Sequence, residues 1–287
     1  MNNTGAPDAK GYAIARGALF DALLALAPLP PNSFVLVGAQ AVYLRAPEGV
    51  IPSIAPFTLD GDLVADPLKI RHPRLIIEHL ERGGFSLRGT NGLYVLSKAP
   101  LDEQYAAHVD IFVPASDEHK WEIESYSTRD ASAIFVQPGL ELALVDHSPM
   151  EIRPIDASQP NESITVEVAG TLALLIAKGW KIHERFEQGP EAFRDVVKDI
   201  TDVYRLLRSS KIEELHAAVH GLPPDRNIVS VAQTGAAHLR KLCRERGPAI
   251  RLLSETLGTV AEVELIAESL EALVDEFCAL VEESLKD

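Results

Sequence analysis

Two aspartates separated by one glycine stand in the segment Phe57–Val64, which reads FTLDGDLV. In a β-strand the side chains alternate between faces, so Asp60 and Asp62 project to the same side, and Gly61 leaves room for close backbone approach. Two carboxylates this close repel each other unless a cation lies between them. Mg²⁺ is the expected cation, because it accepts one or two protein carboxylates together with water and substrate phosphates. The alternative is a polar turn, since Asp-Gly is also a common turn signal.

A third aspartate interrupts an apolar run. The segment His108–Pro114 reads HVDIFVP, with Asp110 in its middle. A buried carboxylate persists only when it is paired or coordinated, so we expect this segment to lie beside the Asp60–Asp62 strand and to share a metal with it. Asp60, Asp62 and Asp110 are therefore the predicted metal ligands, and a purely structural polar cluster is the alternative. His108 is expected to face away from Asp110 as a packing or surface residue.

An Asp-x-Asp strand beside a strand with a single Asp resembles the arrangement of the polymerase-beta-like nucleotidyltransferases. The resemblance extends to Gly38-Ala39, a turn that follows the apolar run Phe34–Val37 and opens an expected helix. In that superfamily a glycine-containing turn holds the triphosphate through backbone N–H groups, which the helix dipole favours. The resemblance therefore implies that Gly38 and Ala39 bind the nucleotide, although Ala39 brings no side-chain hydroxyl.

Two segments of the C-terminal half, LLIAKGWKIHER at 174–185 and RDVVKDITDVYRLL at 194–207, carry a second match. They resemble the helix pair of the AbiEii-type (abortive-infection) nucleotidyltransferases, a family that includes the MenT-like toxins. The motif positions of that family fall on Lys178, Arg185, Asp199 and Asp202, and helical spacing places the members of each pair on one face. The resemblance implies that Lys178 and Arg185 contact the nucleotide, and that Asp199 orients Lys178 or binds the nucleotide itself. The alternative is an ordinary solvated helical hairpin, whose ion pairs contribute little.

The activity that the resemblance implies is transfer of a nucleoside monophosphate from an NTP to an acceptor hydroxyl, with release of pyrophosphate. Such chemistry depends mainly on positioning and charge neutralisation. Asp110 would either complete a second metal site or act as the base, and two metals about 3.5–4 Å apart would stabilise the entering and leaving oxygens. The acceptor would be a tRNA end, a protein hydroxyl or a small molecule, and the implied setting is a toxin with an antitoxin partner or a phage-defence pair.

An alternative function is a catalytically weakened relative that acts as a binding or interaction module. Two departures from the family pattern motivate it, namely Ala39 in the turn and the lack of an arginine shortly before Asp60. Magnesium-dependent NTP binding would distinguish the enzyme from the module.

Composition sets outer limits on the fold and location. The chain has 287 residues, of which 46% are hydrophobic, enough for one large or two modest domains with real cores. A net charge of −15 argues against strong non-specific nucleic-acid binding, so an RNA acceptor would need local basic clusters such as 69–74 and 238–246. Without an apolar span of about 20 residues or a signal-peptide pattern, a cytoplasmic protein without membrane association is expected. Neither Cys243 nor Cys278 is expected to form a disulfide.

Periodicity and turn residues predict an α+β fold, with a mixed sheet and flanking helices over residues 1–165 followed by a C-terminal helical bundle over 166–287. The resemblance implies that the sheet of the first part has the nucleotidyltransferase fold. Proline and glycine supply the expected breaks between elements. The expected helices are 9–27, 40–45, 68–82, 171–187, 190–209, 211–220, 227–246, 248–257 and 260–285. The expected strands are 34–37, 57–64, 85–88, 93–97, 108–114, 133–137, 151–155 and 164–168, with a hairpin turn at 89–92.

Overall fold

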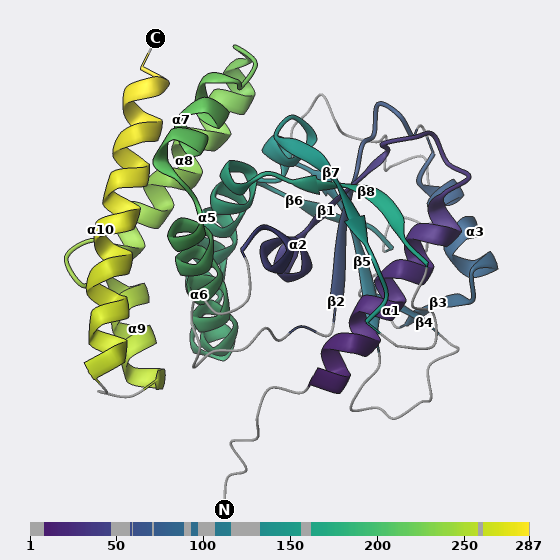
Figure 1. The fold of residues 1–287 in the computed structure, drawn as a ribbon, viewed down its shortest axis with the longest axis horizontal. Coiled ribbons are helices and arrows are strands. Elements are labelled where there is room, and N and C mark those ends of the chain that lie inside the picture. The colour runs from purple at the N-terminus through teal and green to yellow at the C-terminus, as the bar shows by residue number, and fades with distance from the viewer. Residues whose placement is uncertain are drawn as a thin grey trace, which may run out of the picture. The chain divides into compact units, whose positions relative to one another are not determined.

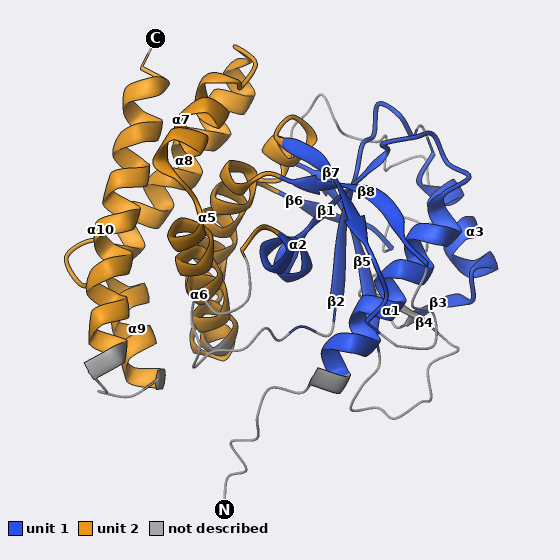
Figure 2. Cartoon of the chain, in the orientation of Figure 1, with its two compact units in different colours: residues 1–44, 51–137, 147–169 blue, residues 45–50, 138–146, 170–287 orange. Residues whose placement is uncertain are grey.

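The protein has an α+β fold, seen here in a computed structural model (Figure 1). The structure describes residues 9–46, 58, 60–70, 72–88, 93–96, 107–115, 133–155, 162–257 and 261–286. The chain divides into two compact units, coloured separately in Figure 2. Unit 1 comprises residues 1–44, 51–137 and 147–169, and unit 2 comprises residues 45–50, 138–146 and 170–287.

Unit 1 is built on a mixed sheet that has eight strands within the described residues. The strand order is β3-β4-β5-β2-β1-β8-β7, and β6 pairs with β5 outside this path. Pairing is parallel between β1 and β8, between β2 and β5, and between β5 and β6, and antiparallel elsewhere. The strands are β1 (Phe34–Val37), β2 (Asp60–Ala65), β3 (Phe85–Arg88), β4 (Leu93–Leu96), β5 (His108–Pro114), β6 (Phe135–Gln137), β7 (His147–Ile152) and β8 (Ile164–Ala169).

Helix α1 (Ala9–Leu26) covers one face of this sheet, where it packs against β2, β5 and β8. Gly61 permits the close approach, because a Cβ at this position would lie 3.1 Å from two side-chain carbons of Leu19. The room predicted at Gly61 is therefore filled by a helix. The other helices of unit 1 are α2 (Gly38–Arg45), which follows β1 directly and whose last residue is assigned to unit 2, and α3 (Pro73–Arg82), which packs on α1.

Unit 2 is a helical bundle. Its helices α5 (Thr171–Gln188) and α8 (Arg226–Cys243) pack most closely where Gly179 faces Gly235, since a Cβ on Gly179 would overlap the Gly235 carbonyl oxygen. Paired glycines thus allow the two helix backbones to meet. The helices of unit 2 are the 3₁₀ turns η4 (Glu141–Leu144) and η5 (Pro190–Ala192), and α5 (Thr171–Gln188), α6 (Phe193–Ser209), α7 (Ile212–His220), α8 (Arg226–Cys243), α9 (Pro248–Leu257) and α10 (Ala261–Ser284).

The segment 138–146 belongs to unit 2 because its last residue caps α5. The Asp146 carboxylate accepts a hydrogen bond from the backbone N–H of Ala173 at 2.8 Å, which satisfies one of the unpaired donors of the first helical turn. Gly170 also donates its N–H to the Asp146 carbonyl at 2.7 Å, and a Cβ at Gly170 would overlap the Asp146 carboxylate. The prediction of a single boundary at residue 165 did not include residues 138–146 in the helical unit. The long helical part of unit 2 begins after Ala169.

Most predicted elements occur within a few residues of their predicted bounds, with two displacements. The helix expected at 68–82 begins only at Pro73, because Asp66 closes a turn by accepting the Leu68 N–H at 3.0 Å. The strand expected at 151–155 is β7 at His147–Ile152, whose limits follow its antiparallel pairing with β8. The predicted turn 89–92 and the segment preceding Thr58 lie outside the described residues. Among the described helices, none has the length and apolar character needed to cross a membrane.

Candidate functional site

Asp60, Asp62 and Asp110 converge in unit 1. One carboxylate oxygen of each lies within 4.8 Å of those of the other two. The parallel register of β2 and β5 produces this convergence, because it pairs Asp62 with Asp110. Buried residues on both strands, such as Leu63 and Ile111, hold the ladder in the core. Asp62 is buried, whereas Asp60 and Asp110 are half-buried.

Gly38 borders this carboxylate group. It is the first residue of α2, it has φ +67°, and a Cβ on it would overlap the Asp62 carboxylate. The register explains the contact, because the preceding residue Val37 is the β1 partner of Asp62. Both the backbone conformation and the space available therefore require glycine here. The turn Gly38-Ala39 lies beside Asp62, as the sequence resemblance implied.

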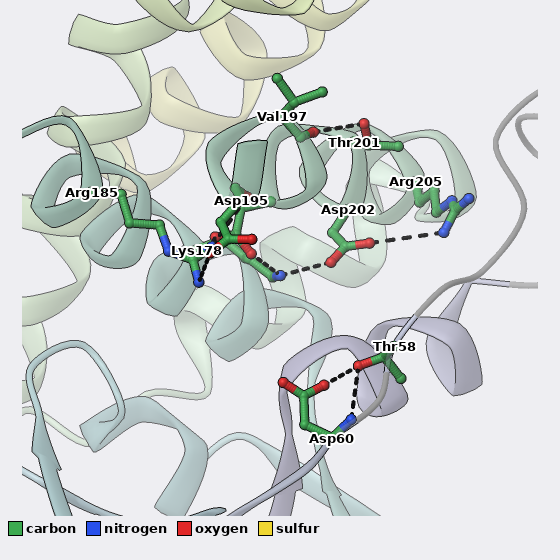
Figure 3. A network of polar contacts seen from close by, with 10 residues as sticks. Thr58, Asp60, Lys178, Arg185, Asp195, Val197, Thr201, Asp202 and Arg205 are labelled. Atoms are coloured by element: carbon green, nitrogen blue, oxygen red, sulfur yellow. Dashed lines mark hydrogen bonds and ion pairs between the residues drawn. The ribbon is translucent and has the colours of Figure 1, made fainter. Parts of the chain in front are cut away.

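Thr58 and Gln40 hold the Asp60 end of β2. The hydroxyl of the buried Thr58 donates to the Asp60 carboxylate and accepts a long hydrogen bond, 3.5 Å, from the Asp60 N–H (Figure 3). The buried Gln40 amide donates to the Asp60 carbonyl oxygen at 3.4 Å and accepts a hydrogen bond from Arg16 Nε at 2.7 Å. These contacts connect α1 and α2 to the strand that carries two of the three carboxylates.

Three residues near the carboxylates were missed by sequence reasoning. His108 is the register partner of Asp60, and the expectation that it faces away from Asp110 is wrong, because residues two apart on a strand share a face. The spacing that identified Asp60 and Asp62 should have identified it. Gln40 stands two residues after Gly38, in the first turn of α2, and this position beside the predicted phosphate-binding turn marks it as a candidate site residue. Nothing in the sequence pattern marks Arg16, whose role depends on how α1 packs.

These three aspartates could hold a metal ion. Their donor set consists of hard carboxylate oxygens, which suit cations such as Mg²⁺, Mn²⁺ or Ca²⁺. Three like charges this close oppose one another's ionisation unless a cation compensates them. The glycine at position 38 supports the same reading, because it gives the Asp62 carboxylate its space beside the turn.

The second predicted group forms a buried ionic network in unit 2. Lys178 Nζ donates to Asp199 Oδ1 at 2.6 Å and to Asp202 Oδ2 at 2.7 Å, with all three side chains at most 5% exposed. Figure 3 shows Lys178 of α5 and its contact with Asp202 of α6. Arg185 donates to the other Asp199 oxygen, and Arg205 lies 3.8 Å from Asp202.

Opposite charges shift the pKa values of the two central residues, Lys178 and Asp199, in favour of their charged forms. Burial on its own would lower the pKa of Lys178, but Asp199 and Asp202 outweigh burial and raise that pKa above its ordinary value. Burial on its own would likewise raise the pKa of Asp199, but Lys178, Lys181 and Arg185 outweigh it and lower that pKa. The two predicted helix faces do meet, and their central residues are buried rather than solvated. Contact of Lys178 or Arg185 with a nucleotide stays a prediction.

The basic clusters named from the sequence are largely neutralised among the described residues. Lys69 pairs with Asp66 at 3.2 Å and Arg74 with Glu78 at 2.9 Å. In the second cluster Arg240 pairs with Glu282, and Arg246 pairs with Glu264 at 2.9 Å. These pairs weaken the case for either cluster as an RNA-binding surface.

Both cysteines are free thiols within unit 2. Burial raises the pKa of Cys278 to about 12 and also raises the pKa of Cys243. Because the thiolate is the reactive form, neither thiol is suited to nucleophilic chemistry.

No protein-family model matches the chain, and no curated protein sequence matches it significantly.

Proposed function

We propose that the protein is a metal-dependent nucleotidyltransferase that transfers a nucleoside monophosphate from an NTP to an acceptor hydroxyl. The observation that carries the proposal is the convergence of Asp60, Asp62 and Asp110, with oxygens within 4.8 Å of one another, from two adjacent strands. A hard-metal site beside a glycine turn at a helix N-terminus is the combination that phosphoryl-transfer chemistry needs.

Each residue at the site has a proposed role. Asp60, Asp62 and Asp110 would hold Mg²⁺, which when bound neutralises charge on the triphosphate and on the leaving pyrophosphate. The first backbone N–H groups of α2, beginning at Gly38 and Ala39, would donate to phosphate oxygens. Thr58 fixes the Asp60 carboxylate through its hydroxyl, and Gln40 fixes the backbone of the same residue. Asp110 would accept the proton of the acceptor hydroxyl or serve as a metal ligand alone.

The acceptor we propose is a tRNA end, a protein hydroxyl or a small-molecule hydroxyl, and the proposed setting is a toxin with an antitoxin partner or a phage-defence pair. Paired surface cations and a net charge of −15 make a protein or small-molecule acceptor easier to accommodate than a long RNA. Lys178 and Asp199 would contribute to nucleotide binding as the resemblance implies.

The test is a transfer assay with radiolabelled ATP, GTP, CTP and UTP over cell extract, with and without Mg²⁺. Transfer of label from an α-phosphate to a macromolecule or metabolite, lost in the Asp62→Asn variant, supports the proposal. Folded protein that transfers no label from any NTP and binds none in calorimetry contradicts it.

A binding module built on the same fold is the second candidate, and Ala39 favours it. This residue is buried and offers only its backbone to a phosphate, where a hydroxyl would add a contact. Folded protein that gives no heat on calorimetric titration with any NTP in the presence of Mg²⁺ would support the module.

A further inference from the structure

An exposed pair of histidines on α7 lies outside the proposed active-site group. His216 and His220 stand four positions apart (i, i+4), so they are neighbours on one helix face. Their Nε2 atoms lie 3.1 Å apart, and both side chains are exposed. An adjacent stripe of the helix is anchored in unit 2 by Leu215 and Val219, which are buried. A rigid, packed helix therefore presents two imidazoles with their nitrogens already close together.

We propose that His216 and His220 form a chelating site for a borderline divalent transition-metal ion such as Zn²⁺, Ni²⁺ or Cu²⁺. Imidazole nitrogen is a preferred ligand of these ions, whereas Mg²⁺ and Ca²⁺ prefer oxygen. The site is distinct in donor chemistry from the carboxylate group of Asp60, Asp62 and Asp110 and does not depend on the proposed transferase activity.

The distance between the two nitrogens fits chelation. With metal–nitrogen bonds of about 2.0–2.1 Å, a separation of 3.1 Å corresponds to a nitrogen–metal–nitrogen angle of about 100°. That angle lies between the roughly 90° of an octahedron and the roughly 109° of a tetrahedron, so common coordination geometries are accessible. The ring planes are now 86° apart. Rotation about χ2 is cheap because this torsion has broad minima, so both lone pairs can turn toward one ion.

Without metal, the same geometry is a hydrogen bond in which one neutral imidazole donates and the other accepts. When a metal binds, the donor ring changes tautomer by exchange with water, so its proton moves from Nε2 to Nδ1. Both Nε2 lone pairs then face the ion, both rings carry their proton on Nδ1, and no net proton is released. Water would complete the coordination.

The test is calorimetric titration of the full-length protein with Cu²⁺ and with Zn²⁺ near neutral pH, in the presence of excess Mg²⁺ to occupy oxygen-rich sites. Replacing either histidine, in His216→Gln or His220→Gln, should weaken binding by about tenfold or more, which corresponds to about 1.4 kcal/mol. The double variant should lack this binding event. All these side chains are exposed, so the variants should fold, and circular dichroism checks that they do.

Two controls separate this site from others. Asp62→Asn should leave Cu²⁺ binding at the histidine pair unchanged, and His79→Gln on α3 should do the same. Electron paramagnetic resonance of the Cu²⁺ complex should show coupling to two imidazole nitrogens in the wild-type protein and to fewer in each single variant. Unchanged affinity in the double variant, or a spectrum with oxygen ligands alone, would overturn the proposal and leave the pair as a hydrogen bond between two rings.

Discussion

Asp62 of β2 and Asp110 of β5 are direct partners in a parallel ladder, and their carboxylates belong to one group of three with oxygens within 4.8 Å. Parallel pairing of strands about fifty residues apart requires a crossover, which α3 and the β3–β4 hairpin provide. The site is therefore a product of the sheet topology, and its residues can be tested separately from the helical unit.

Asp62→Asn should abolish nucleotidyl transfer, with a loss of about a thousandfold or more, because a metal ligand supports several kcal/mol of transition-state stabilisation. Stability of the metal-free protein should stay the same or rise, since the change relieves repulsion among three carboxylates. Transfer assays and thermal unfolding in EDTA measure the two effects. Asp66→Asn is the matched control, because Asp66 follows the same strand but caps a turn and pairs with Lys69. A large loss of stability in metal-free Asp62→Asn would identify a structural polar cluster.

Gly38→Ala should destabilise the protein by about 1–3 kcal/mol, because alanine is strained at positive φ and its Cβ would displace the Asp62 carboxylate. Metal affinity should fall at the same time, as measured by Mn²⁺ titration. Gly17→Ala is the control, since a Cβ there meets nothing within 4 Å and α1 is helical around it. That change should be neutral or stabilising by about 0.5–1 kcal/mol. Equal behaviour of the two variants would show that the Gly38 turn does not support Asp62.

Much of this site could be predicted because its signals are local. The Asp60–Asp62 spacing follows from strand alternation, and Asp110 stands out as a charge in an apolar run. The helices of unit 2 follow from apolar periodicity interrupted by proline and glycine. The nucleotidyltransferase fold itself stays a prediction.

The contacts that could not be predicted depend on tertiary packing. Asp146 caps a helix that starts after an intervening strand pair, and Arg16 reaches Gln40 only because α1 lies across the sheet. Neither residue stands in a local pattern that marks its partner. The predicted start of α3 was wrong for a related reason. Pro67 and Pro73 both suit a first helical turn. The hydrogen bond from the Leu68 N–H to the Asp66 carboxylate closes a turn after Asp66, so the helix begins at Pro73.

Stability should fall as the pH drops from about 6.5 toward 4, in part because of His238. This ring stacks on His183 with centroids 3.8 Å apart, and burial, His183 and Lys241 lower its pKa from 6.5 to about 4. Between those two pKa values His238 binds a proton in the unfolded chain but not in the folded chain. The contribution of His238 to the free energy of unfolding is therefore complete above pH 6.5 and is lost as the pH falls toward about 4. His238→Phe keeps an aromatic ring and should flatten this part of a stability–pH curve measured by urea unfolding. His79→Phe is the control, and a curve for His238→Phe that matches the wild type would contradict the assignment.

Lys178→Met should destabilise unit 2 by about 3–5 kcal/mol, because it leaves the charges of the buried Asp199 and Asp202 without their shared cation. The double variant Lys178→Met/Asp199→Asn should be more stable than the single one, since Asp202 keeps Arg205 and the less buried Arg185 keeps Asp195. Urea unfolding of the wild type, both single variants and the double variant gives the coupling energy of the pair.

The stability of unit 2 should also depend on pH through Asp199. The pKa of Asp199 is lowered in the folded state, so its contribution to the free energy of unfolding is complete above about pH 4 and is lost as the pH falls below that. Asp199→Asn should therefore reduce the loss of stability in acid. If Lys178→Met instead unfolds like the wild type but binds NTP more weakly in calorimetry with Mg²⁺, the lysine serves the nucleotide and not the bundle.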